Sequence, residues 1–119
     1  MEVRTSVRDK VLVVTGMVGV QMASGAIANF AEWLHRNDYW RLRVHHLQVQ
    51  NPQMVFLYLR NEQGEMRNER VVLGPIKGYE SKLNKLRIFL ENGEDATRDK
   101  HYSELDLRFK GQVIGRSGN

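Results

Sequence analysis

Apolar positions in the first third of the chain predict one strand followed by one helix. Residues Val11 to Val14 form a short β-branched run closed by Gly16, which is typical of a buried strand. Ser24, a residue type favoured at helix N-caps, then precedes a stripe of apolar residues with helical spacing: Ile27, Phe30, Ala31 and Leu34. This helix is expected to end near Arg36-Asn37, where a cation and a residue that tolerates left-handed backbone suit a helix terminus.

The middle of the chain has the pattern of three strands. Residues Leu42 to Val49 alternate imperfectly, with Leu42, Val44 and His46 on one side and Arg43, His45 and Leu47 on the other. After a turn at Asn51-Pro52, the aromatic and β-branched segment from Met54 to Arg60 predicts a second strand. A polar connection around Gly64 leads to a third, at Val71 to Gly74, so that the three strands predict an antiparallel meander.

A second amphipathic helix is predicted after Gly78. Its apolar residues fall at helical spacings i, i+4, i+7 and i+11: Tyr79, Leu83, Leu86 and Leu90. The basic residues Lys82, Lys85 and Arg87 are expected to face largely away from the core. Asn92-Gly93 is expected to end the helix, and residues 94–102 to form a polar loop.

The clearest strand pattern comes at the end of the chain. Apolar residues alternate with Asp106 and Arg108, stop at Lys110-Gly111 and then resume; they are Leu105, Leu107, Phe109, Val113 and Ile114. This pattern predicts a strand, a tight turn and a last short strand. A last strand can have a neighbour on only one side, and an unpaired sheet edge is either protected or used for binding.

The element order β-α-β-β-β-α-β-β predicts an α+β fold, a mainly antiparallel twisted sheet with two helices packed on one face, in a single domain over residues 1–119. The content of 41% hydrophobic and 27% charged residues is that of a folded chain. There are no cysteines, which excludes disulfides and thiolate sites. The formal net charge of +4 favours anionic partners in general.

The sequence offers no catalytic, metal or cofactor site. The four histidines are His35, His45, His46 and His101, and the adjacent pair is expected to point to opposite faces of a strand, where it cannot readily share a metal. No nucleophile motif and no glycine-rich phosphate loop is present. We therefore expect a protein that is not an enzyme, without cofactor, metal ion or small-molecule substrate.

One segment leaves a nucleic-acid-binding α+β module open as an alternative. Arginines and aromatic residues are mixed at Arg36, Tyr39, Trp40, Arg41 and Arg43, a combination that can bind phosphates and stack on bases. The competing interpretation is that Tyr39 and Trp40, which follow a helix and lead into a strand, cap the core. Phosphate contacts would be recognised by a steep loss of binding with salt.

Four segments together resemble the C-terminal extracytoplasmic β domain of the bacterial cell-division family FtsQ/DivIB, in its Bacteroides-type version. The segments are VLVVTG, FAEWLHRNDYW, RVVLGPIKGYESKLNKLRIFLENG and HYSELDLRFKGQVIGR. The resemblance covers about Val11 to Arg116. It is sharpest in the LG…KLNKL segment and in the closing LDLRF-GQV hairpin.

The resemblance implies a scaffold of the divisome that has no catalytic activity and recruits FtsB and FtsL for septum formation. Family members have a short cytoplasmic tail, one transmembrane helix, a POTRA domain and then this β domain on the periplasmic side of the inner membrane. The present chain would then be a truncated ectodomain that lacks the first three of these parts.

The resemblance also implies a binding site at the end of the chain, because in the family FtsB adds a strand beside the final strand. The matching positions are Phe109, Lys110, Gly111, Gln112, Val113, Ile114, Gly115 and Arg116. Apolar Val113 and Ile114 would contact the partner, and Lys110 and Arg116 would meet its acidic residues. The alternative is an ordinary sheet margin, kept monomeric by these two cations and by its shortness.

Overall fold

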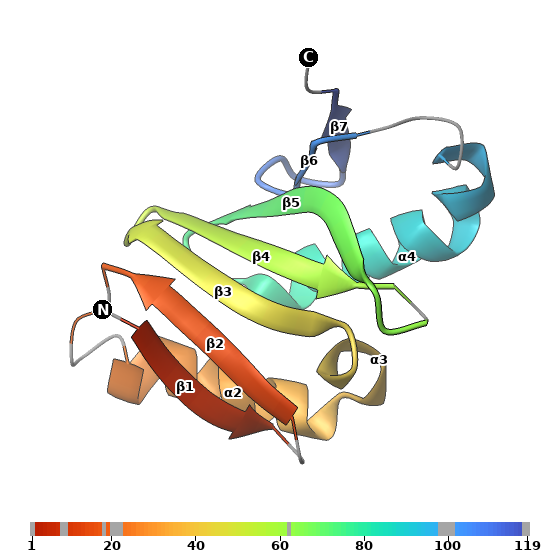
Figure 1. The fold of residues 1–119 in the computed structure, drawn as a ribbon. Coiled ribbons are helices and arrows are strands. Elements are labelled where there is room, and N and C mark those ends of the chain that lie inside the picture. The colour runs from red at the N-terminus through yellow and green to blue at the C-terminus, as the bar shows by residue number, and fades with distance from the viewer. Residues whose placement is uncertain are drawn as a thin grey trace.

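The described residues form one seven-stranded sheet whose strands follow one another in chain order (Figure 1). The computed structural model describes residues 2–7, 10–17, 19, 23–61, 63–97 and 102–117, with side chains for 12–17, 19, 25–61, 63–91 and 102–117. The strands are β1 (Glu2–Val7), β2 (Lys10–Gly16), β3 (Val44–Asn51), β4 (Met54–Arg60), β5 (Met66–Gly74), β6 (Glu104–Asp106) and β7 (Ile114–Arg116). The helical segments are a π-helical turn, η1 (Ala23–Ile27), and the α-helices α2 (Ala28–Arg36), α3 (Asp38–Arg41) and α4 (Tyr79–Thr97).

The sheet is mainly antiparallel. Strands β1–β2, β3–β4, β4–β5 and β6–β7 pair antiparallel, whereas β2–β3 and β5–β6 pair parallel. A parallel pair needs a crossover connection, and here the crossovers are the segment with α2 and the helix α4. Both of these helices lie on the same face of the sheet (Figure 1). The predicted α+β class and the antiparallel meander β3-β4-β5 are therefore confirmed.

The core lies between the sheet and this helical layer. Helix α2 contributes Phe30 and Leu34, and α4 contributes the buried residues Leu83, Leu86 and Leu90, so both predicted apolar stripes are confirmed. The sheet contributes alternate residues from β2 to β6, among them Leu12, Val14, Leu47, Val49, Val55, Leu57, Leu59, Val71, Leu73 and Leu105.

The first strand was not predicted from the sequence. Residues Glu2 to Val7, part of a charged leader, pair with β2 in a regular antiparallel register from Glu2↔Thr15 to Val7↔Lys10. A strand at a sheet edge is stabilised by backbone bonds to one neighbour, so it does not need a continuous apolar pattern. The predicted N-cap at Ser24 falls on a side chain outside those described; α2 begins later, after η1, without a side-chain cap at Ile27.

An irregularity in β3 explains the imperfect alternation there. The register with β4 shifts between Val44 and His46, so Val44 and Leu47 are both buried although they lie three residues apart. Leu42, which was expected within the strand on the same side as Val44, lies before β3 and is 52% exposed.

Other expected boundaries were displaced. Helix α4 continues through Asn92-Gly93 to Thr97, because one glycine costs a helix only about 1 kcal/mol and does not by itself end it. The polar loop predicted at residues 94–102 is therefore helical in its first part, and residues 98–101 lie outside the described residues. The first helix ends at Arg36 as predicted, but Asn37 is extended at φ −108° and caps α3 by accepting a hydrogen bond from the Trp40 amide.

Candidate partner-binding edge

Strand β7 forms one margin of the sheet, as predicted for the end of the chain. It pairs with β6 through the partners Glu104↔Arg116, Leu105↔Gly115 and Asp106↔Ile114, and it is last in the strand order. Both β6 and β7 have three residues, and they project at one end of the molecule (Figure 1). In the described part of the chain, the far side of β7 therefore has no strand next to it.

The backbone of β7 presents Gly115 to this open side. Directly after β6, the Leu107 amide donates to the Val72 carbonyl of β5 at 2.9 Å, so the odd-numbered Leu105 of β6 also bonds toward β5. Directly before β6, the Ser103 amide donates to the Arg116 carbonyl at 2.8 Å, which directs the Arg116 carbonyl of β7 toward the β6 side. Backbone groups alternate in direction along a strand, and the even-numbered residues therefore bond toward β7. Their partners are Ile114 and Arg116, which leaves the N–H and C=O of Gly115 directed away from the sheet.

Only three of the eight residues predicted to bind a partner lie in this strand. Phe109, Lys110 and Gly111 form the turn after β6, in which the Gln112 amide donates to the Phe109 carbonyl at 3.2 Å. Gly111 adopts φ +71°, the left-handed backbone that favours glycine. Gln112 is exposed and Val113 is partly buried against the core, ahead of the strand residues Ile114, Gly115 and Arg116.

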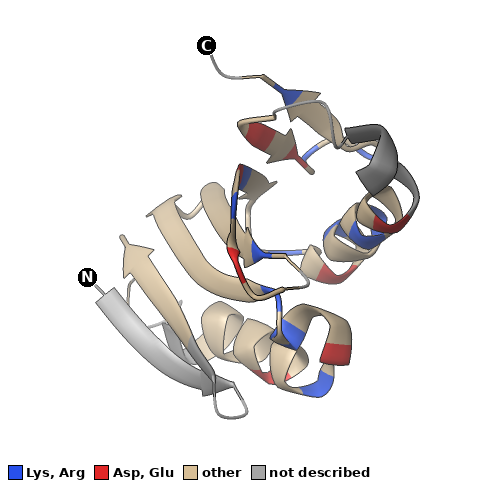
Figure 2. Ribbon diagram, turned by 45° about the vertical axis from the view of Figure 1, so that its right-hand side comes forward, with Lys and Arg blue, Asp and Glu red and all other residues tan. Residues whose placement is uncertain are grey.

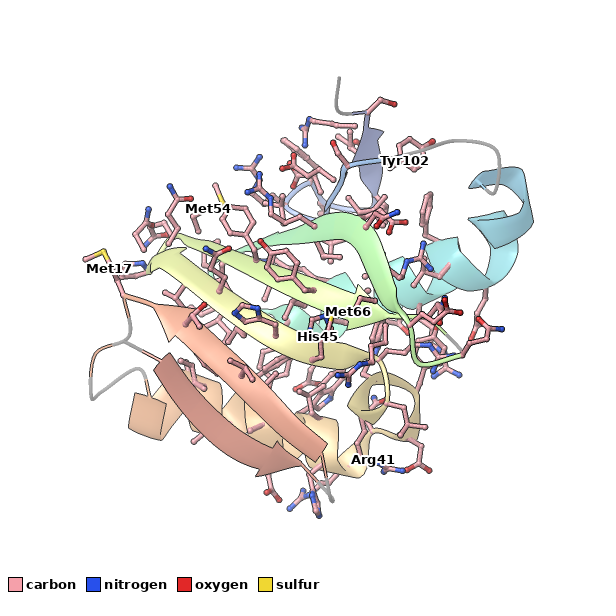
Figure 3. The ribbon with its side chains drawn as sticks, viewed as in Figure 1. Met17, Arg41, His45, Met54, Met66 and Tyr102 are labelled. Carbon is pink, nitrogen blue, oxygen red and sulfur yellow. The ribbon has the colours of Figure 1, made fainter. Side chains whose placement is uncertain are left out.

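Gly115 is required by a contact within the chain. A Cβ atom at this position would lie 2.5 Å from the ring of Tyr102, a distance that real Cβ atoms essentially never show. Tyr102 lies beside β7 (Figure 3). The absence of a side chain therefore lets the aromatic ring pack on the strand, a role that the sequence did not reveal.

A buried carboxylate ties β7 to the rest of the hairpin. Asp106 is 0% exposed and accepts hydrogen bonds from the Arg108 amide at 3.0 Å, from Arg108 Nη2 at 2.7 Å and from Arg116 Nη1 at 2.7 Å. Burial alone would raise the pKa of Asp106, but the hydrogen bonds from the two arginines hold it well below its usual range. The basic end of β7 lies beside the acidic residues of β6 in Figure 2.

The network extends to β5. Arg116 Nη1 also lies 3.0 Å from Glu104 Oε2, and Arg70 Nη2 of β5 lies 2.8 Å from Glu104 Oε1. Arg116 was expected to meet acidic residues of a partner. In the structure it forms ion pairs with Glu104 and Asp106 of its own chain. Lys110 is exposed and makes no ion pair within the described residues. The sequence signal for the network was the i, i+2 spacing of Asp106 and Arg108, which places both on one face of a strand.

Helix α4 holds the other side of the hairpin. Lys85 Nζ donates to the Leu107 carbonyl at 2.8 Å and to the Phe109 carbonyl at 2.6 Å. Lys82 Nζ donates to the carbonyls of Leu73 at 2.8 Å and Pro75 at 3.1 Å. The prediction that these two lysines face away from the core was wrong, because their long stems reach over apolar residues to carbonyls at strand ends.

The comparison with known families agrees with this architecture. The family described as "FtsQ/DivIB, C-terminal related" matches residues 1–116, nearly the whole chain. The chain belongs to this family. The resemblance stated from the sequence is thereby confirmed, and FtsQ/DivIB membership makes the chain a cell-division domain. No curated protein matches the sequence.

Membership of the FtsQ/DivIB-related family places the chain in a group of division scaffolds that are not known as enzymes. The family is part of the division machinery, which implies protein partners, and its proteins are membrane-anchored. No helix in the described ranges is long and apolar enough to span a membrane.

An apolar groove runs beside the edge of this FtsQ/DivIB-related domain. It is lined by Lys85, Ile88 and Phe89 of α4 and by Gly111 and Val113 of the hairpin. Ile88 is 53% exposed and Phe109, in the adjoining turn, 44% exposed. Apolar side chains thus continue from the turn onto the helix, next to the strand edge.

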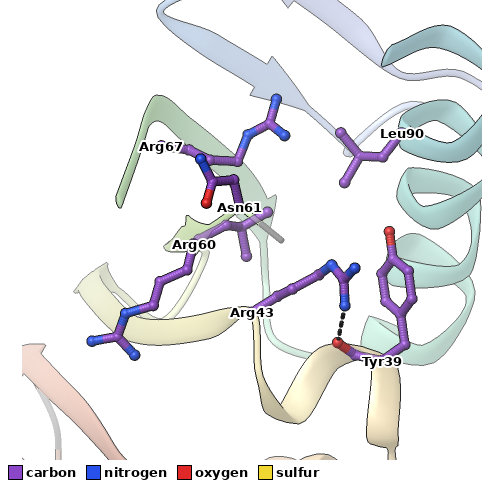
Figure 4. Close-up of a pocket in the computed structure, with 7 residues that line it drawn as sticks. Tyr39, Arg43, Arg60, Asn61, Arg67 and Leu90 are labelled. Atoms are coloured by element: carbon purple, nitrogen blue, oxygen red, sulfur yellow. Dashed lines mark hydrogen bonds between the residues drawn. The ribbon is translucent and has the colours of Figure 1, made fainter. Parts of the chain in front are cut away.

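Both aromatic residues of the arginine-rich segment make contacts inside the protein. Trp40 is 2% exposed and belongs to the core, as the competing interpretation predicted. The Tyr39 ring has the guanidinium carbons of Arg43 and Arg87 at 3.8 Å and 4.3 Å from its centroid, and Arg43 Nη1 donates to the Tyr39 carbonyl at 2.9 Å (Figure 4). Tyr39 and Arg43 line a small pocket together with Leu90 of α4. In Figure 4 the guanidinium of Arg60 points away from this pocket.

The histidine pair lies in β3 and forms no metal centre with other described residues. The ring centroids of His45 and His46 are 6.3 Å apart, and His46 Nε2 lies 2.7 Å from the Thr15 hydroxyl of β2. No group of three or more histidine, cysteine or acidic residues suited to a metal ion occurs within the described residues. His101 lies outside them.

Proposed function

We propose that this chain is a non-enzymatic scaffold domain of the divisome that recruits FtsB/FtsL-like proteins by strand addition at β7. In the cell it would act as one domain on the periplasmic side of the inner membrane, where the complex supports septum formation. Family membership supports the division role, and the open edge of β7 supports the mode of binding. The observation that carries the proposal is the outward direction of the Gly115 backbone beside an apolar groove.

Strand addition suits this edge for physical reasons. Main-chain hydrogen bonds supply affinity in this mode, while alternate side chains supply specificity. An incoming strand would bond to the N–H and C=O of Gly115, and its neighbouring apolar side chains would contact the groove at Ile88 and Phe89. The exposed Lys110 would favour acidic residues on the partner.

Calorimetry with the soluble coiled-coil ectodomains of FtsB and FtsL from the same organism tests the proposal. Val113→Pro removes a backbone donor at the start of the edge, whereas the matched control Val113→Ala trims the side chain and keeps the N–H. Outside the sheet ladders, the Val113 amide donates no backbone hydrogen bond to another described residue, so the proline variant is expected to fold. We expect binding by the wild type, somewhat weaker binding by the alanine variant because the Val113 side chain lines the groove, and loss of binding by the proline variant.

If Val113→Pro and Val113→Ala lose binding to the same extent, the affinity comes from burial of the Val113 side chain, and this result would count against strand addition. Absence of binding by the wild type at high concentration would count against FtsB/FtsL recruitment by this domain. A filter-binding assay with a salt series would then test the nucleic-acid alternative.

A further inference from the structure

Strand β7 and the turn before it have less apolar contact with the domain than β6, whose Leu105 is buried in the core together with Leu107 directly after it. Both strands have three residues, and β7 pairs with β6 alone. Beyond Leu107, the apolar side chains Val113 and Ile114 are only partly buried. Because hydrophobic stabilisation scales with the apolar area removed from water, such partial burial fixes a segment weakly. Polar contacts therefore contribute to the position of β7.

One of these contacts comes from the helical layer. Lys85 Nζ donates to two carbonyls of the same connection, that of Leu107 directly after β6 and that of Phe109 in the turn. The Phe109 carbonyl is also the acceptor of the bond that closes the turn, from the Gln112 amide. An ammonium shared by two carbonyls makes charge-assisted hydrogen bonds and holds both relative to the helix. Lys85 is partly buried, and this burial lowers its pKa.

Helix α4 also provides a close structural counterpart. Lys82, three residues earlier, has the same arrangement, in which its ammonium donates to the carbonyls of Leu73 and Pro75. Burial likewise lowers its pKa. These carbonyls belong to the end of β5 and to the connection to α4, and neither belongs to the β6–β7 hairpin, although Gly74 between them lies close to the Arg108 side chain. Each of the two lysines thus donates hydrogen bonds to two backbone carbonyls. Of the two, only Lys85 bonds to carbonyls of the connection between β6 and β7.

We propose that Lys85 is a positioning residue, which fastens the β6–β7 turn to α4 and thereby keeps β7 where a partner strand can add. The link to partner binding rests on the proposed function. The positioning of β7 itself is measurable in the isolated domain, so the two ideas can fail separately.

Backbone amide hydrogen exchange, measured by NMR, tests the positioning. The variants are Lys85→Met and the matched control Lys82→Met, each of which keeps an apolar stem of similar length and removes the ammonium. In Lys85→Met the amides of Gln112 and Ile114 are expected to exchange about tenfold faster, the factor for the net loss of roughly one hydrogen bond. In Lys82→Met they should exchange as in the wild type, and Lys85→Arg, which keeps several donors, should restore slow exchange.

The same proteins are then titrated with the FtsB/FtsL-like ectodomains. Lys85→Met should bind about tenfold more weakly, because the edge is ordered only on binding, while Lys82→Met should bind like the wild type. Equal exchange at the hairpin amides in both methionine variants would overturn the positioning role. Faster exchange with unchanged affinity would overturn its link to docking. If the wild type does not bind, the proposed function fails, and exchange alone decides whether Lys85 positions β7. If Lys85→Met does not fold, Lys85→Gln replaces it in both measurements.

Discussion

Replacement of Asp106 by asparagine tests how much the buried network contributes to stability. The substitution keeps the shape of the side chain and removes its charge. In the wild type, the carboxylate accepts hydrogen bonds from the Arg108 backbone and from the guanidinium groups of Arg108 and Arg116. An asparagine amide nitrogen at this position would face N–H groups, so at least one donor loses its acceptor.

The expected loss in the free energy of unfolding depends on how deeply Asp106 and its two arginine partners are buried. Removal of one partner of a fully buried ion pair costs about 3–5 kcal/mol. Asp106 is fully buried, but the side chains of Arg108 and Arg116 are 37% and 42% exposed and can turn to water. We therefore expect a loss of about 2–3 kcal/mol in the free energy of unfolding, part of a total of about 5–15 kcal/mol. The melting temperature should fall by about 6–12 °C.

Urea denaturation at several pH values is the assay, and Glu104→Gln is the matched control. Glu104 belongs to the same network but lies at its solvent side, so its neutralisation should cost only about 1 kcal/mol. The folded-state pKa of Asp106 is lowered, so its stabilisation is fully present above the unfolded pKa of about 3.9 and is lost as pH falls toward the folded pKa. The stability gap between wild type and Asp106→Asn should therefore be constant above about pH 5 and shrink below about pH 4. Equal stability of Asp106→Asn and Glu104→Gln at pH 7, or a gap between wild type and Asp106→Asn that is unchanged at pH 2–3, would contradict the stabilising role of the Asp106 carboxylate.

Three further predictions concern the core and the edge. Leu86→Asp should leave the domain unfolded by circular dichroism, because it buries an unpaired charge, whereas Ile88→Asp on the exposed side of α4 should shift the melting temperature little; a folded Leu86→Asp protein would show that the core is misplaced. Gly115→Ala should destabilise the domain by about 1–3 kcal/mol in urea titrations through its clash with the Tyr102 ring, and an added Tyr102→Ala should relieve that clash; no recovery in the double variant would contradict the contact. On addition of the FtsB/FtsL-like partner, amide exchange at Gly115 should slow strongly while the amide of Ile114, already directed at β6, changes little; equal changes at both would argue against an added strand.

Elements that depend on local patterns were predictable from the sequence. The spacing of Phe30 and Leu34, and of Leu83, Leu86 and Leu90, identified two helices and the faces that they bury, because side chains three or four residues apart must share a helical face. The meander and the closing hairpin followed from alternation and turn residues. The family was also recognisable, since its motifs lie in these same segments. Local patterns placed boundaries less well, as the continuation of α4 through Gly93 shows.

The tertiary structure decided what the polar residues do. Nothing in the sequence indicated that Lys85 bonds the turn carbonyls or that Arg116 is held by Asp106, because each contact joins elements whose proximity only the folded sheet creates. The charged segment at Glu2–Val7 became a strand because β2 provides its backbone partners. Apolar periodicity reports which face is buried, and it therefore specifies the core. Hydrogen bonds of charged side chains depend on distances between remote segments, and those distances are set only when the strands take their order in the sheet.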